Sequence, residues 1–497
     1  MSGKVLHVEN SRTALTVSAS GTPNAKHYPQ YTAAILATLS AFAAGSTLSW
    51  SSPALPLLES PDSLVHISKE QGTWISSIIT LGACIGAIPA GLMVNGIGRR
   101  TSLQILGTGL LVSWFLIGYS TSFNVLFIGR ALAGVCIGAI SVAAPLYVSE
   151  IAEPRLRGTL GSLFQLQITL GVLFEYVIGA MLNDFLVLAL ITALGPLIFI
   201  TTFSFMPESP VYLCSKGKER SARKALQWFR GERYDIEDEY TRMGDAIQEQ
   251  KNNESSLSDI IQSRSLVRAL IISLGLMFFQ QMSGINAVIF YTSKIFYDAG
   301  STIKPEFCSI IIGAFMMGAT YVSTLLMDRA GRRILLLISG SIMSLCLGCL
   351  SAYFHFATKY DLREYSFIPL ISVALFIVVF SLGFGPIPWL MMGEIFPSNV
   401  KGPASSLAAS FNWITAFIVT KTFEPIVGTI GSFATFSIFT CVCIFGTIFV
   451  LVLVPETKGK SVEEIQAELS GEEENGKVEF ILSLERGTKV SMNTNID

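Results

Sequence analysis

Side-chain amides lie within several long apolar stretches of this sequence, and five of them are candidate ligand-binding groups. They are Gln165, Gln280, Gln281, Asn286 and Asn412. A carboxamide both donates and accepts hydrogen bonds from one uncharged planar group, whereas an unpaired amide in an apolar environment is costly. We therefore expect these side chains to face a wet cavity and to bind a neutral ligand with many hydroxyl groups. Hydrogen bonding between neighbouring helices is the alternative role for the same residues.

The amides near residue 280 need a break in their helix if they are to act together. On an ideal helix the side chains of Gln281 and Asn286 point about 140° apart. Ser283 and Gly284 lie between them, and such a pair is a common site of helix kinks. The sequence therefore predicts an interrupted helix that turns Asn286 toward the same ligand.

Three aromatic residues stand close to interruptions or to the amides. Trp389 directly follows Pro388, and because proline disrupts a helix, we expect Trp389 at a bend beside the cavity, where its ring can stack on an apolar face of the ligand. Phe290 and Tyr291 are expected to form an external lid over the site. Ordinary packing against lipid or at the membrane interface is the alternative for all three rings.

Acidic and basic residues recur near the ends of the apolar stretches. Ion pairs that form in one conformational state and separate in another bias the equilibrium between the states, so we expect this set to act as a gate. A permanent structural clamp is the alternative. The candidate gating residues are Arg99, Arg100, Glu150, Arg157 and Glu208 in the first half, and Arg332, Arg333, Glu394, Lys401 and Glu456 in the second.

The elements that must hold these side chains are membrane-spanning helices. The chain has 497 residues, of which 51% are hydrophobic and 14% charged, against about 25% charged in ordinary soluble proteins. Twelve stretches have the roughly 20 mostly apolar residues that a crossing needs. These features predict an all-α polytopic protein of the lipid bilayer and exclude a soluble multidomain enzyme. The net charge of −2 offers no basic field for nucleic acid, and we expect no metal site, no cofactor and no obligate protein partner.

The distribution of basic residues predicts the topology. Connections on the even-numbered side carry more Lys and Arg than those on the odd side, and the central segment adds a further basic cluster. The positive-inside rule therefore places that side and both termini in the cytoplasm, and we expect the plasma membrane as the location. The expected organisation is a cytosolic tail at 1–30, a six-helix bundle at 31–206, a cytoplasmic linker with short helices at 207–265, a second six-helix bundle at 266–454 and a cytosolic tail at 455–497.

The two halves repeat the same motifs in the same order at a nearly constant offset. This pattern indicates an internal duplication in parallel orientation, which is how one class of secondary transporter is built. The first repeated motif is Gly-Arg-Arg, at 98–100 and 331–333. The second is an acid that stands seven residues before a basic residue followed by glycine; the acid is Glu150 in the first half and Glu394 in the second. The third is Pro-Glu-Ser-Pro at 207–210, which matches Pro-Glu-Thr-Lys at 455–458.

Together with Arg130 and the runs at 280–286 and 385–389, these motifs resemble those of the sugar porters of the major facilitator superfamily. The resemblance extends from the first apolar stretch to Gly459, and the run FGPIPWLMMGEIFP is most similar to arthropod facilitated trehalose and hexose transporters. It implies the major facilitator fold, in which two six-helix bundles rock about a central sugar site. Asn95 replaces an acid usual in the family, and Met316 stands where glucose carriers place a sugar-binding Asn.

The sequence also bears on energy coupling. Sugar porters that couple to protons usually carry an Asp in the first span, whereas residues 44–50 contain no acid here. We therefore expect facilitated transport of a neutral sugar such as glucose or trehalose. Glu175, in the middle of a span, is the candidate proton site, with pairing to Arg130 or permanent protonation as alternatives. A proton/sugar symporter and a transporter-like sugar sensor remain the competing functions, and no constellation for a membrane enzyme is present.

Overall fold

The computed structural model describes residues 25–60, 65–252, 263–301 and 303–470. Every regular element in these ranges is a helix, as the sequence predicts. The reason is that a segment surrounded by hydrocarbon must pair all of its backbone N–H and C=O groups, and a helix does so within one segment. Most of the predicted N-terminal tail and the end of the predicted C-terminal tail lie outside the described residues.

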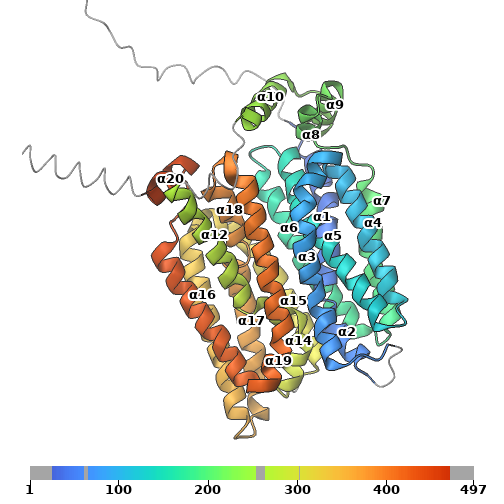
Figure 1. The fold of residues 1–497 in the computed structure, drawn as a ribbon, viewed down its shortest axis with the longest axis vertical. Helices are drawn as coiled ribbons and strands as arrows, with labels where there is room; N and C mark the ends of the chain where they lie inside the picture. Colours follow the sequence, from blue (N-terminus) through green and yellow to red (C-terminus); the bar gives the residue numbers. More distant parts are fainter. Residues whose placement is uncertain (1–24, 61–64, 253–262, 302, 471–497) are drawn as a thin grey trace, which may run out of the picture.

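Six helices long and apolar enough to cross a membrane make up the N-terminal bundle, which is drawn from blue to green in Figure 1. Its first span is α1, which continues almost directly into the short helix α2. The helices are α1 (Tyr28–Ser49), α2 (Ser51–Leu58), α3 (Lys69–Ile97), α4 (Arg99–Gly118), α5 (Phe123–Ile151), α6 (Arg157–Met181) and α7 (Phe185–Phe203).

Three short helices follow and lead to the C-terminal bundle. They are α8 (Pro210–Ser215), α9 (Glu219–Arg230) and α10 (Glu237–Asn252). The C-terminal bundle comprises α12 (Arg264–Met282), α13 (Ile285–Phe290), α14 (Thr292–Asp298), α15 (Pro305–Ala330), α16 (Arg332–Ala357), a 3-10 turn at Arg363–Tyr365, α17 (Phe367–Leu382), α18 (Ile387–Ile395) and α19 (Ser398–Leu453), and α20 (Val462–Ser470) follows it.

Helix α19 accounts for the last two spans. It has 56 residues, which is more than twice the roughly 20 that cross a bilayer once. Gly431 has φ 83° and ψ 163°, so the backbone leaves the helical conformation there and α19 consists of two crossing helices. Eleven helices of the described residues are long and apolar enough to cross a membrane when α19 is counted once, and its division at Gly431 gives the predicted twelve spans.

Two helices of the C-terminal bundle are interrupted where the sequence predicts it. Helix α12 ends at Met282, Gly284 adopts a left-handed conformation with φ 86°, and α13 starts at Ile285. Similarly, α17 ends before Gly383, and α18 begins at Ile387 directly after Pro386. Proline is well tolerated at the start of a helix because the N–H that it lacks has no helical partner at that position.

Close helix packing in the N-terminal bundle depends on glycine. Helices α3 and α5 lie side by side, and a Cβ atom at Gly138 would collide with the carbonyl oxygen of Ala83. A Cβ at Gly86 would likewise collide with the carbonyl oxygen of Val135. Glycine at these positions therefore allows the two helices to approach closely.

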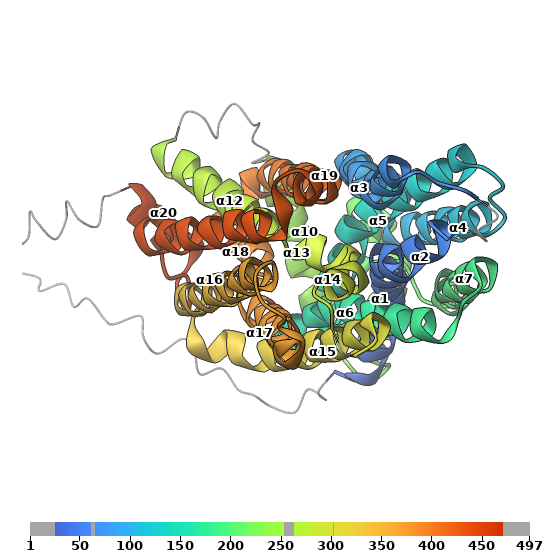
Figure 2. The same cartoon turned by 90° about the horizontal axis from the view of Figure 1, so that it is seen from below.

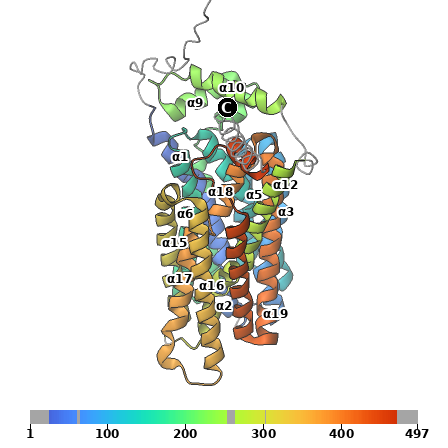
Figure 3. The ribbon, with the colours of Figure 1, turned by 90° about the vertical axis from the view of Figure 1, so that its left-hand side faces the viewer.

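The two bundles lie next to each other, with α13 and α14 between them in the view along the helices (Figure 2). Helices α9 and α10 cover one end of the molecule (Figure 3), which we call the linker end; the opposite end, where α2 and α14 meet, is the far end.

Each bundle carries its own short helices at the linker end. The guanidinium of Arg230, at the end of α9, donates to the Ile151 carbonyl oxygen at 2.8 Å and pairs with Glu239 of α10 at 2.6 Å. On the other bundle, Arg268 of α12 donates to the carbonyl oxygen of Leu469 in α20 at 2.6 Å. The linker helices are thus fastened to the N-terminal bundle and α20 to the C-terminal bundle.

Candidate functional site

Four of the five predicted amides form one hydrogen-bonded chain. Gln281 Nε2 donates to Asn412 Oδ1 at 2.8 Å, and Asn412 Nδ2 donates to Gln280 Oε1 at 2.7 Å. Asn286 Nδ2 donates to Gln281 Oε1 at 2.5 Å. The left-handed turn at Gly284 makes this last contact possible, because it brings Asn286 back toward Gln281 after the helix ends. Asn412 belongs to α19, so the chain joins α12, α13 and α19.

Gln280 connects this chain to the second helix break. Its Nε2 donates to the carbonyl oxygens of Phe384 and Gly385, each at 2.7 Å. These carbonyls lie between α17 and α18, where the interrupted helix leaves them without a helical partner. The amide of Gln280 is 3% exposed and fully occupied, so its role in the structure is to hold the two broken helices together.

The amides also differ in what they leave free for a ligand. Asn286 is half-buried, and its Oδ1 accepts no hydrogen bond from a described residue. Gln165 of α6 is also half-buried, and it forms no hydrogen bond within the described part of the chain. The structure therefore leaves Gln165 outside the amide chain, in the other bundle, where its full hydrogen-bonding capacity is available.

Trp389 lies on α18, just after the break. It packs on a small cluster formed by Met277, Met392 and Ala408, and Met277 is also in contact with the Asn412 amide. The indole is half-buried. This position places a large aromatic face next to the amide chain, at the bend that the two prolines predict.

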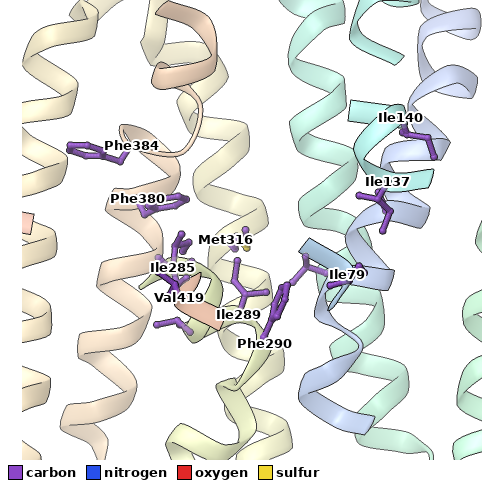
Figure 4. Packing of buried hydrophobic residues seen from close by; sticks show 14 of the residues in the cluster. Ile79, Ile137, Ile140, Ile285, Ile289, Phe290, Met316, Phe380, Phe384 and Val419 are labelled. Carbon is purple, nitrogen blue, oxygen red and sulfur yellow. The ribbon is translucent and has the colours of Figure 1, made fainter. Parts of the chain in front are cut away.

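Phe290 and Tyr291 close the space between the bundles on the far side of the amides. Both are buried, and the Phe290 ring points from the C-terminal bundle toward Ile79 of the N-terminal bundle (Figure 4). The Tyr291 hydroxyl donates to the Thr420 carbonyl oxygen at 3.2 Å. Met316 is buried in the same apolar cluster as Ile289 and Phe290.

The linker end of the N-terminal bundle contains a network of the predicted charges. The Arg99 guanidinium pairs with Glu150 at 2.8 Å, and both side chains are about nine-tenths buried. Glu208 accepts the backbone N–H groups of Arg99 and Arg100 at 3.0 and 2.9 Å, so it caps the start of α4. Such capping satisfies N–H groups that have no helical partner. Gly98, at φ 102°, leaves room for the carboxylate.

The C-terminal bundle repeats this network. Arg332 pairs with Glu394 at 2.9 Å, and Glu456 accepts the N–H groups of Arg332 and Arg333 at the start of α16. Partial burial raises the pKa of Glu456, but the backbone hydrogen bonds from Lys458, Arg332 and Arg333 outweigh it and hold this pKa below its usual value. The agreement of the two networks shows the duplication in three dimensions.

The two remaining gating candidates are not part of these networks. Arg157, at the start of α6, is exposed and forms no ion pair with a described residue. Lys401 donates to the carbonyl oxygen of Gly393 at 2.9 Å, within its own bundle.

Glu175 is buried and forms no ion pair with any of the residues that the structure describes. Arg130 donates instead to the carbonyl oxygens of Thr47 at 2.8 Å and Ile75 at 3.3 Å and to the Ser51 hydroxyl at 3.0 Å. No ion pair joins Arg130 to Glu175 among the described residues, so the predicted alternative of a direct pair is wrong for this conformation.

The only polar side chain bonded to Glu175 in the described chain is Thr192. Its Oγ1 lies 3.0 and 3.2 Å from the two carboxyl oxygens and 2.8 Å from the Leu188 carbonyl oxygen. A hydroxyl group has one proton, so it cannot fully serve both acceptors. All three groups are satisfied when the carboxyl donates to Thr192 and Thr192 donates to Leu188.

Sequence reasoning did not identify the polar contacts that join the bundles near the far end. The Tyr176 hydroxyl of α6 donates to the Ile289 carbonyl oxygen at 2.7 Å, and the hydroxyls of Ser52 and Ser293 lie 3.0 Å apart. Lys421 of α19 donates to Thr73 of α3 at 2.7 Å. Only Lys421 carried a signal, because it is a charge inside an apolar stretch.

Comparisons with known proteins agree on one family. A family model described as "Sugar (and other) transporter" matches residues 15–469. Facilitated trehalose transporter Tret1 of Anopheles gambiae is 40% identical over 481 residues, covering 93% of this chain and 60% of that protein. Facilitated trehalose transporter Tret1 of Culex quinquefasciatus is 39% identical over 472 residues, covering 94% of this chain and 91% of that protein.

Solved structures show the same architecture. The major facilitator superfamily proton:xylose symporter XylE bound to 6-bromo-6-deoxy-D-glucose superposes with a TM-score of 0.72 at 23% identity, covering 89% of this chain and 99% of that one. An inward open conformation of the xylose transporter XylE from E. coli gives a TM-score of 0.73 at 23% identity, covering 87% and 98%. This likeness confirms the predicted major facilitator fold.

Proposed function

Because the chain belongs to the family of sugar (and other) transporters, we propose that it moves a neutral sugar down its gradient by alternating access. The sugar is a hexose such as glucose, or the disaccharide trehalose. The observation that carries the proposal is the amide chain of Gln280, Gln281, Asn286 and Asn412, held at two helix breaks. Relatives at 39–40% identity whose names state facilitated trehalose transport support the choice.

The site works by keeping most of its hydrogen bonds inside the protein. Asn412 and Gln280 are occupied and fix the orientation of Gln281 and Asn286, whose remaining donors and acceptors meet sugar hydroxyls. Gln165 provides a contact from the other bundle, and Trp389 stacks on the apolar face of the ring. On binding, each sugar hydroxyl replaces a hydrogen bond to water by one to an amide, and the net free energy gained is about 0.5–1.5 kcal/mol per hydrogen bond. Binding therefore stays weak enough for release.

The moving bodies are the bundles at 31–206 and 266–454. In this state Phe290, Tyr291 and their neighbours seal the far end. Opening the far end requires the bundles to separate there, while the linker end closes. The Arg99–Glu150 and Arg332–Glu394 pairs, with Glu208 and Glu456, stiffen the linker end of each bundle. Arg100, Arg333, Arg157 and Lys401 are the further proposed gating residues at this end, and Arg157 and Lys401 lie outside the two networks.

We assign the linker end to the cytoplasm, so both termini are cytoplasmic, and the protein to the plasma membrane. The support is the excess of Lys and Arg in the connections on that side and in the linker. Protease digestion of sealed right-side-out vesicles tests it. Cleavage in α9 or α10 from outside would overturn the orientation.

Transport is proposed to be uncoupled from protons. A mobile proton needs a titratable group that changes its exposure between states, whereas Glu175 is buried and its hydrogen bonds are complete when it is neutral. Proton/sugar symport is the second candidate, and the same buried carboxyl is the observation in its favour.

The test is uptake of labelled glucose and labelled trehalose into proteoliposomes, with and without an inward proton gradient. Equilibration of one sugar, unaffected by the gradient, is the expected result and names the substrate. Accumulation driven by the gradient would replace uniport with symport. Uptake of neither sugar would remove the proposed substrate class and leave a sensor as the next hypothesis.

A further inference from the structure

Lys421 is a charged residue within the membrane-spanning part of α19. It precedes Gly431, the turn of α19 at the far end, by ten residues, which corresponds to about 15 Å along a helix. Ionisable side chains at such depth are costly and usually have a function. The site described above does not use Lys421.

The ammonium group of Lys421 is held by the opposite bundle. Its Nζ donates to Thr73 Oγ1 at 2.7 Å, while the Thr73 hydroxyl donates its own proton to the Glu70 carbonyl oxygen at 2.8 Å. Nζ also lies 4.1 Å from the centroid of the Trp74 ring, which is cation–π geometry. Both contacts connect α19 to α3, and both are broken when the bundles separate at this end.

The surroundings of Lys421 keep the ammonium available for this contact. The nearest acid on its own helix, Glu424, is paired with Lys294 of α14. These groups line a cavity of about 620 Å³ between α3, α14 and α19. Glu70 and Asp298 also line this cavity, so the ammonium has charged neighbours when it leaves Thr73.

We propose that Lys421 is a latch that sets the equilibrium between far-end-closed and far-end-open states. The latch is a charge-assisted hydrogen bond to Thr73 combined with a cation–π contact to Trp74. It is a positioning residue, because it acts on the state of the transporter and not on the sugar. The inference rests on the alternating-access part of the proposed function.

The experiment is hydrogen–deuterium exchange of the full chain in nanodiscs without sugar, for wild type, Lys421→Met and Thr73→Val. Methionine keeps most of the lysine stem, and valine keeps the shape of threonine. Lys69→Met is the matched control, since Lys69 lines the same cavity, is exposed and forms no hydrogen bond with a described residue.

In Lys421→Met, the rate of hydrogen–deuterium exchange in α13 and α14 is expected to rise about 10-fold. Loss of one charge-assisted hydrogen bond shifts a two-state equilibrium by about this factor. Exchange at the linker ends of α6 and α18 should fall at the same time, and Thr73→Val should show a smaller change of the same sign. Lys69→Met should match wild type.

Unchanged exchange in Lys421→Met, an equal rise at both ends, or an equal effect of Lys69→Met would overturn the latch. Sugar uptake by the same variants separates the two proposals. A shifted exchange pattern without uptake in wild type would retain the latch and reject the sugar, whereas uptake with an unshifted pattern would reject the latch alone.

Discussion

Replacing Glu175 with glutamine distinguishes the two transport mechanisms. The side chain is 0% exposed and has Thr192 as its hydrogen-bonding side-chain partner. An ionised carboxylate there would cost several kcal/mol, a large part of the roughly 5–15 kcal/mol that stabilises a typical protein. A neutral carboxyl avoids this cost, and glutamine is its uncharged equivalent of nearly equal size. Glu175→Gln should therefore change the free energy of unfolding by less than about 1 kcal/mol.

Glu150→Gln is the matched comparison, because it makes the same substitution at an acid that is paired. The side chains of Arg99 and Glu150 are 9% and 10% exposed. Glu150→Gln therefore leaves a buried Arg99 guanidinium without a carboxylate partner. Breaking such a pair costs about 3–5 kcal/mol. Thermal unfolding in detergent should thus show a small shift for Glu175→Gln and a large decrease for Glu150→Gln.

Uptake completes the test of Glu175. Facilitated sugar uptake by Glu175→Gln should stay within about 2-fold of wild type, since a change of at most about 0.5 kcal/mol is expected in the transport barrier. A loss of uptake, or an unfolding temperature lowered as far as in Glu150→Gln, would refute the neutral carboxyl.

Two further predictions concern the amide chain and the far end. Asn412→Leu should weaken binding of either sugar about 10-fold, because Gln280 and Gln281 lose their shared partner and reorient. Calorimetric titration measures this change. The control is Ser273→Ala on α12, the helix of Gln280 and Gln281; it removes a buried hydroxyl that has no hydrogen-bond partner among the described residues, and it should match wild type. Burial and the charge of Glu424 raise the pKa of Glu59, so the folded protein binds this proton more tightly than the unfolded chain does, and its stability increases as the pH falls toward the raised pKa. The unfolding temperature should consequently rise more in wild type than in Glu59→Gln between pH 7 and pH 5, and parallel profiles would contradict this reasoning.

The sequence predicted the spans and their breaks because these depend on local physics. Apolar length defines a crossing, and glycine and proline interrupt helices at Gly284 and Pro386 whatever their surroundings. The residues of the two charge networks could also be predicted, because the duplicated motifs place the same residue types at corresponding positions in both halves.

Partners far apart in the chain were not predictable in the same way. The sequence identified the amides as polar groups at membrane depth. Which amide bonds to which depends on how α12 packs against α19, so the pairing of Asn412 with Gln280 and Gln281 could not be predicted. The expected option of an Arg130–Glu175 pair failed because the junction of α1 and α2 offers Arg130 the Thr47 carbonyl and the Ser51 hydroxyl. Such competition is visible only in three dimensions.

Because α10 and α20 are attached to different bundles, each half of the molecule has a helix outside the membrane that moves with it and can be labelled. Arg230 fixes the linker helices to the N-terminal bundle, and Arg268 fixes α20 to the C-terminal bundle. A fluorescent donor on α10 and an acceptor on α20 would therefore report the angle between the halves by energy transfer, with no label in a transmembrane helix. The molecule is thus suited to conversion into a genetically encoded sensor of its own transport cycle.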